Sequence, residues 1–126
     1  MMDLAALRAY LLAGVGRTEE SPFGPDSLVF KIMGKMFALV AWEAVPLRIT
    51  LKCDPEMALE LRDRYTAVTP GYYMNKQHWN TITLDGSIPE DEIRTMIDAS
   101  YALVVKGLPK AVREALARGE VPPVAE

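Results

Sequence analysis

The chain has very few of the residues that form disulfides and zinc sites. Its 126 residues include one cysteine, Cys53, and one histidine, His78. A single cysteine excludes an internal disulfide, and together with one histidine it falls short of the four ligands of a structural zinc. We therefore expect no metal site and no cofactor. The lone cysteine also favours a reducing compartment, the cytoplasm.

Long apolar runs and excess positive charge are missing as well. Half of the residues are apolar, but no run is long enough to span a bilayer, so we expect no membrane partner. Asp3 precedes the first apolar stretch, unlike the basic start of a signal peptide. The net charge is −3, so any binding to nucleic acid must come from a local cluster of lysines and arginines.

The length fits one domain, because a chain of this size buries about two-thirds of its unfolded surface in a single core. We find no repeat and no linker. Residues 1–120 are expected to form this domain. Residues 121–126, which contain two consecutive prolines, form a C-terminal tail.

Two β-rich runs, residues 28–33 and 36–42, predict a hairpin. The residues between them are Gly34 and Lys35, and glycine at the first central position is typical of a type II′ turn. A two-residue turn fixes the register, which here pairs Ile32 with Phe37 and Phe30 with Leu39 on the buried face.

Two further strands and four helices complete the expected fold. Residues 47–53 alternate between apolar and polar types, and residues 80–84 form another β-rich run. Helices are predicted after Asp3, after Asp54-Pro55, from Pro89 to Gly107, and over residues 110–117. Consecutive hairpin-linked strands with helices packed on one face indicate an α+β fold with an antiparallel sheet.

The other face of this sheet is expected to stay open. Alternation along the strands gives it cations, hydroxyls and two tryptophans, namely Lys31, Trp42, Arg48, Thr50, Lys52, Trp79, Thr81 and Thr83. Exposed tryptophans among cations are typical of a binding surface.

Three segments, taken in order and spacing, resemble a known family. Residues 30–38 read Phe-Lys-Ile-Met-Gly-Lys-Met-Phe-Ala, residues 51–55 read Leu-Lys-Cys-Asp-Pro, and residues 70–79 read Pro-Gly-Tyr-Tyr-Met-Asn-Lys-Gln-His-Trp. With Pro22-Phe23-Gly24 and Ser100-Tyr101, they resemble the MmcQ/YjbR family over nearly the whole chain. The resemblance implies a sandwich like that of the bacterial frataxin CyaY and a DNA-binding role through a double-wing arrangement. It brings no catalytic residues.

The leading hypothesis is therefore a noncatalytic DNA-binding or regulatory module. It would contact phosphates through cations on the open face and at the hairpin tips, and stack or wedge a tryptophan against the bases. The residues assigned to this surface are Lys31, Lys35, Trp42, Arg48, Lys52, Asn75, Lys76, His78 and Trp79.

Alternatives remain open at this stage. Asn75, Lys76 and His78 cluster beside an aromatic residue and are compatible with a small-molecule or enzymatic pocket, but also with a plain turn and a structural histidine. Trp79 is compatible with an anchor against the second helix. The open face is equally suited to a protein partner or a homodimer.

Overall fold

The computed structural model describes residues 2–71 and 75–122. This part of the chain folds into four helices and six strands. In chain order they are α1 (Leu4–Leu11), β1 (Arg17–Glu20), β2 (Ser27–Ile32), β3 (Lys35–Ala41), β4 (Arg48–Lys52), α2 (Pro55–Arg64), β5 (Val68–Pro70), β6 (Trp79–Thr83), α3 (Glu90–Lys106) and α4 (Lys110–Ala117).

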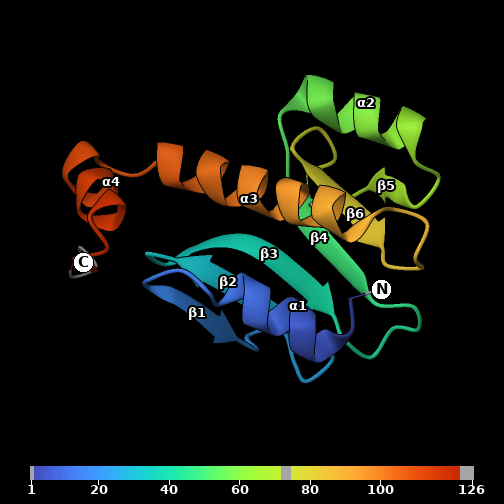
Figure 1. The fold of residues 1–126 in the computed structure, drawn as a ribbon, viewed down its shortest axis with the longest axis horizontal. Helices are drawn as coiled ribbons and strands as arrows, with labels where there is room; N and C mark the ends of the chain where they lie inside the picture. The colour runs from blue at the N-terminus through green and yellow to red at the C-terminus, as the bar shows by residue number, and fades with distance from the viewer. Residues whose placement is uncertain (1, 72–74, 123–126) are drawn as a thin grey trace.

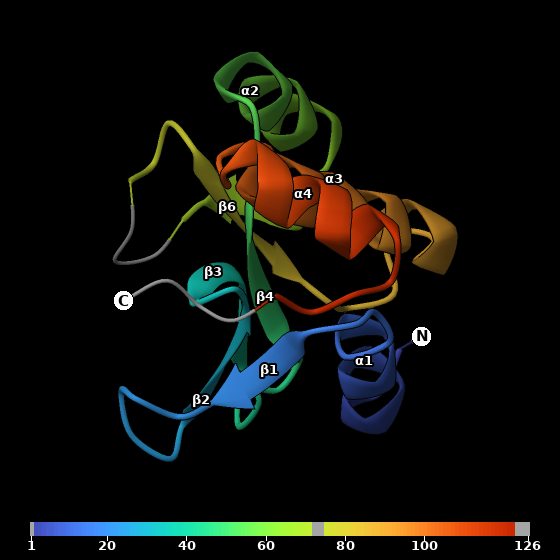
Figure 2. The ribbon, with the colours of Figure 1, turned by 90° about the vertical axis from the view of Figure 1, so that its left-hand side faces the viewer.

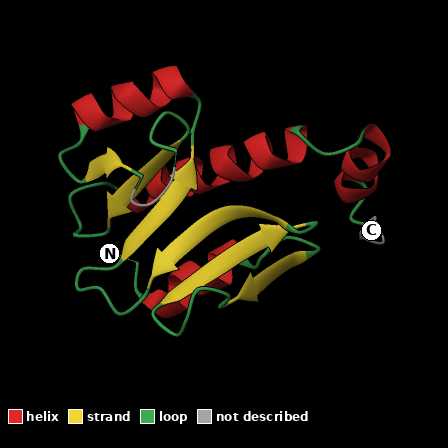
Figure 3. Ribbon diagram, turned by 180° about the vertical axis from the view of Figure 1, so that it is seen from behind, coloured by secondary structure: helices red, strands yellow, loops and turns green. Residues whose placement is uncertain are grey.

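The strands form one antiparallel sheet in the order β1-β2-β3-β4-β6-β5. Helices α1 and α3 cover one face, and from behind the strands stand in front of both (Figures 1 and 3). In Figure 2, α4 lies in front of α3 and α2 lies above both. The expected α+β fold, an antiparallel sheet with its helices on one face, is confirmed. No helix among the described residues is long and apolar enough to cross a membrane.

The core lies between the sheet and its helices. Phe30 of β2 and Phe37 of β3 are fully buried, together with Leu7 of α1 and Ile97 of α3. The helices are also joined at their surfaces, because the Tyr10 hydroxyl of α1 donates to a carboxylate oxygen of α3 at 2.7 Å. The apolar stripes read from the sequence therefore do meet in one core.

The hairpin turn between β2 and β3 differs from the prediction by one residue. Ile32 pairs with Lys35, so the two turn residues are Met33 and Gly34. Their φ angles are 50° and 78°. Two consecutive positive φ angles are typical of a type I′ turn, which matches the right-handed twist of the strands as types I and II do not. The predicted Gly34-Lys35 turn is therefore wrong.

A β-bulge in β3 changes the register again. Phe30 pairs with Ala38 but Lys31 pairs with Met36, so Phe37 is an extra residue. Phe37 and Ala38 are both fully buried on the helix side. The next residue, Leu39, pairs with Val29 on the opposite face, so the predicted pair of Phe30 with Leu39 is wrong.

Two edge strands escaped prediction. β1 is short and highly charged, and β5 has three residues and ends in a proline, so neither shows an apolar alternation. The sequence also predicts a short partner strand at residues 72–74. These residues and the last four of the expected tail, 123–126, lie outside the described part of the chain.

Candidate functional site

The sheet face opposite α1 and α3, here called the helix-free face, is buried at its centre. Val29, Leu39, Thr50 and Thr81 form its central row through direct strand pairing. Val29, Thr50 and Thr81 are only 1%, 4% and 7% exposed, and the Thr50 and Thr81 hydroxyls lie 2.9 Å apart in a hydrogen bond. The exposed binding surface expected across this face is therefore limited to its two ends.

One end of the helix-free face gathers lysines around a tryptophan. Because Ala38 pairs with Leu51 in antiparallel strands, the start of β3 and the end of β4 lie at the same end of the sheet. Lys52 pairs directly with Trp79, the first residue of β6. We call this end of the sheet the basic end. Its members on the helix-free face are Lys31, Lys52 and Trp79, and Lys35 joins them from the other face, because it pairs with inward-facing Ile32 beside the hairpin turn.

The lysines of the basic end differ in their availability. The Lys31 ammonium lies 2.8 Å from the Glu20 carboxylate, which neutralises it. Lys35 is exposed and Lys52 is half-buried, and neither forms an ion pair within the described residues. Trp79 is also half-buried, so part of its indole remains accessible. Two unpaired cations and an aromatic ring are the chemically available groups here.

The described parts of the segment 70–79, which are residues 70–71 and 75–79, border the basic end, and Arg62 of α2 makes several of their contacts. The Arg62 guanidinium donates to the backbone oxygens of Lys76 and, at 3.4 Å, of Trp79. Gly71 donates its N–H to the Trp79 oxygen at 2.8 Å, and a Cβ atom there would lie 2.7 Å from the Trp79 Cβ. Gly71, which lies in one of the segments that resemble the family, is therefore required because a larger side chain would collide with Trp79. The Lys76 ammonium donates to the Gly71 oxygen at 3.2 Å, so it is partly engaged within the loop.

Asn75 and His78 serve the backbone of this loop. The Asn75 side-chain oxygen accepts from the Gln77 N–H at 2.9 Å, which is the Asx turn that the sequence left as one alternative. His78 donates its N–H to the Asn75 oxygen and accepts from the Cys53 N–H at 2.7 Å. Among the described residues, no side chain forms a hydrogen bond with the His78 ring.

Arg48 and Trp42 do not join the basic end. Arg48 begins β4, four residues from Lys52 and hence roughly 13 Å away at the opposite end of the strand. Trp42 follows β3 on the side of α1, where it borders a hollow with Leu4, and its Nε1–H donates to the Pro25 oxygen at 2.6 Å. The expected position of Trp42 on the open face is wrong, because it lies an even number of residues from inward-facing Val40.

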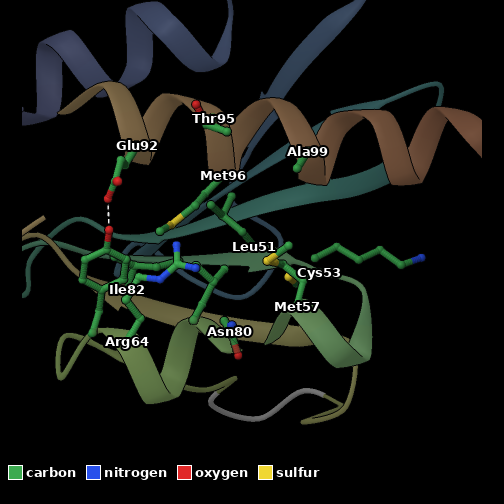
Figure 4. Close-up of a pocket in the computed structure, with 13 residues that line it drawn as sticks. Leu51, Cys53, Met57, Arg64, Asn80, Ile82, Glu92, Thr95, Met96 and Ala99 are labelled. Carbon is green, nitrogen blue, oxygen red and sulfur yellow. Dashed lines mark hydrogen bonds between the residues drawn. The ribbon is translucent and has the colours of Figure 1, made fainter. Parts of the chain in front are cut away.

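A separate cavity of about 400 Å³ lies between α2 and α3, above β4 and β6 (Figure 4). Its lining does not include Asn75, Lys76 or His78, where the sequence suggested a pocket. The residues that line it are Leu51, Lys52, Cys53, Met57, Leu61, Arg64, Tyr65, Asn80, Ile82, Glu92, Thr95, Met96 and Ala99. Burial is the main cause that raises the pKa of the Cys53 thiol, with the Asp54 charge as the second, so the thiol stays protonated at neutral pH.

Sequence reasoning missed the residues that hold this region together. The sequence analysis gave Arg62 no role, yet an arginine at helical spacing with Ala58 and Leu61 on the inner side of its helix needs acceptors for its donors. Ser100 was noted only for its place in a motif. Its fully buried hydroxyl accepts from the Lys52 N–H at 2.9 Å and donates to the Phe37 oxygen at 2.6 Å.

Comparison with known proteins places this chain among bacterial relatives. The YjbR family model matches residues 12–103. Uncharacterized protein YjbR of Escherichia coli K12 is 33% identical over 115 residues, covering 91% of this chain and 98% of its own length. Uncharacterized protein YbdF of Escherichia coli O157:H7 is 44% identical over 90 residues, covering 71% of this chain and 73% of its own.

Solved structures agree with this placement. The Deinococcus radiodurans protein DR2400, with a domain named DUF419, is 37% identical and superposes with a TM-score of 0.87, covering 100% of this chain and 94% of that one. A Pseudomonas syringae protein is 28% identical with a TM-score of 0.71, covering 81% of this chain and 98% of its own. The family match and the full-length relative lead to one conclusion: this chain belongs to the YjbR family.

Proposed function

We propose that the protein is a noncatalytic DNA-binding module that contacts its ligand through the basic end of the sheet. The observation that carries this proposal is the direct pairing of Lys52 with Trp79, with Lys35 at the same end. The ammonium groups would bind phosphates, and the accessible part of the indole would stack on a base. A cytoplasmic location and a CyaY-like sandwich are parts of the same proposal.

The charge distribution sets the strength of this interaction. The net charge is −3, and only a few cations gather at the basic end, with Lys31 already paired to Glu20. With two or three phosphate contacts, the logarithm of the binding constant should fall by about 1.4 to 2.1 for single-stranded DNA and by about 1.8 to 2.7 for duplex DNA with each tenfold increase in salt. Binding should therefore be weak and clearly detectable only at low salt. Single-stranded DNA should be preferred, since its bases are free to stack on Trp79.

Fluorescence of Trp79 tests the proposal directly. The chain has two tryptophans, so Trp42→Phe leaves Trp79 as the only reporter. Adding a single-stranded 20-mer at low salt should quench its emission, and a parallel duplex titration measures the preference. Quenching should decrease along a salt series with the slope given above.

Matched charge reversals locate the surface. Lys52→Glu and Lys35→Glu should each abolish most of the binding. Arg48→Glu makes the same change at the opposite end of β4 and should have a much smaller effect. Equal losses in all three variants would point to a nonspecific charge effect, and no binding of either DNA at low salt would refute the proposal.

A homodimer through the helix-free face has less support. Val29, Thr50 and Thr81, at the centre of that face, are already buried within one chain. Sedimentation measures the oligomeric state independently of DNA.

A further inference from the structure

The cavity between α2 and α3 has an apolar body. Leu51 of β4 and Ile82 of β6 form its floor, and Leu61, Met57 and Met96 form its walls. In Figure 4, the labelled Met96 comes from α3 and the labelled Met57 from α2, and they lie on either side of Leu51. Methionine side chains are flexible and make favourable contacts with aromatic rings, so these walls can adapt to a planar ligand.

This space is accessible and larger than a packing defect. Its volume of about 400 Å³ falls in the range of small-molecule sites, roughly 300 to 1,000 Å³. Met57 is 45% exposed, and Thr95 and Ala99 on the opposite wall are exposed as well, so solvent reaches the lining. Covering apolar surface that now contacts water gives an apolar ligand a favourable free energy of binding.

A carboxylate lies at one end of the cavity. Glu92 lies in the first turn of α3, where a carboxylate interacts favourably with the helix dipole. Its Oε2 accepts a hydrogen bond from the hydroxyl of Tyr65, which follows the last turn of α2 (Figure 4). Among the described residues only Tyr65 bonds to this carboxylate, so Oε1 is available to a donor from a ligand.

The cavity lining also contains two cations, Arg64 and Lys52, but neither gives the cavity a site for an anion. The Arg64 guanidinium is paired with Glu60 of its own helix at 2.9 Å. Lys52 alternates with Leu51 along β4, so the Leu51 side chain faces the cavity and the Lys52 side chain belongs to the helix-free face beside Trp79. The available polar atom is therefore an acceptor.

We propose that this cavity binds a small amphipathic amine, with its apolar or aromatic body between Met57 and Met96 and its ammonium group on the Glu92 carboxylate. The Tyr65 hydroxyl positions that carboxylate. The Cys53 thiol contributes apolar surface to the wall, and binding is noncovalent. This site adjoins the basic end at Lys52, which lines the cavity, but the proposed amine binding does not depend on DNA binding.

Three probes with the same phenylpropyl body test the head group: 3-phenylpropylamine, 3-phenylpropan-1-ol and 3-phenylpropanoate. Binding is followed by NMR of protein labelled at its seven methionine methyl groups. Millimolar amine should shift the Met57 and Met96 signals selectively. The alcohol should bind at least about tenfold more weakly, because a charge-assisted hydrogen bond is stronger than a neutral one, and the carboxylate should be weakest.

Two variants separate charge from shape. Glu92→Gln keeps an oxygen for the Tyr65 hydroxyl but removes the charge, so it should weaken the amine about tenfold and leave the alcohol unchanged. Ala99→Leu fills the space and should abolish binding of both. Ala111→Leu makes the same change at an exposed site on α4 and should leave binding intact. Thermal unfolding of each variant verifies that it is folded.

Three results would overturn the proposal. The first is the absence of any selective shift of Met57 or Met96 with all three probes. The second is binding of the carboxylate as tight as that of the amine. The third is an amine affinity that Glu92→Gln leaves unchanged.

Discussion

Arg62 of α2 donates a hydrogen bond from Nε to the side-chain oxygen of Asn80 in β6, 2.7 Å away. Asn80 is fully enclosed, and its amide also donates to the Ala58 oxygen of α2 at 3.3 Å. Nη2 of Arg62 donates to the backbone oxygens of Lys76 and Trp79. One side chain therefore joins a helix, a strand and the loop that borders the basic end.

Arg62→Ala should lower the free energy of unfolding by about 1.5 to 3 kcal/mol, because it leaves the buried Asn80 oxygen without its charged donor. Arg64→Ala on the same helix removes only an exposed pair with Glu60 and should change stability by less than about 1 kcal/mol. Urea unfolding measures both. Similar losses in the two variants would show that Arg62 is no more than a surface residue.

Ser100→Ala should cost about 1 to 3 kcal/mol, because the fully buried hydroxyl links the Lys52 N–H to the Phe37 oxygen. Alanine leaves both backbone groups without this partner. Ser21→Ala, in an exposed loop, is the matched control and should change stability by less than about 0.5 kcal/mol. A neutral Ser100→Ala in urea unfolding would contradict the bridging role.

Gly34→Ala should destabilise the protein by about 1 kcal/mol through its backbone conformation alone. Its φ is 78°, which alanine rarely adopts, although no atom lies within 4 Å of an added Cβ. Gly107→Ala offers a control, since φ there is −81° and the nearest contact is an ordinary 3.5 Å. Alanine at that site should be neutral or stabilising by up to about 1 kcal/mol. A lower unfolding temperature for Gly107→Ala than for Gly34→Ala would contradict the type I′ turn.

The sequence predicted the fold class, the four helices and the central strands because each carries a strong local signal. Asp3 and Asp54, expected as N-caps, both accept from backbone N–H groups at the starts of their helices. The hairpin register failed because its turn places Met33 at positive φ, which local propensity disfavours. The bulge at Phe37 was also invisible, since a sequence pattern does not mark which strand holds an extra residue.

The candidate site was harder to predict than the fold. Alternation correctly placed Lys52 and Trp79 on one face, but it gave no position along the sheet, so Arg48 was grouped with residues at the other end. The cavity had no signature at all. Its lining comes mainly from two helices and two strands that are distant in the sequence, and Tyr65 and Glu92 meet only in the folded chain, where they join the two sides of the cavity.

The Cys53 thiol gives a pH-dependent test of the cavity. Burial and the Asp54 charge raise its pKa, so iodoacetamide should alkylate it more slowly at pH 8 than it alkylates the urea-unfolded protein. The folded pKa lies above the unfolded one, so this contribution to stability is present below the ordinary thiol pKa and is lost as pH rises through the folded value. The free energy of unfolding of Cys53→Ala should therefore decrease less than that of the unmodified protein as pH rises through this range.

Ligand protection extends the same measurement to the proposed amine site. Since Cys53 lines the cavity, 3-phenylpropylamine should slow its alkylation further, and Ala99→Leu should remove this protection because the added side chain occupies the space of the ligand. Ala111→Leu should retain it. Alkylation that is as fast in the folded as in the unfolded chain would show that the thiol is freely accessible and that the cavity wall is open to solvent at this point.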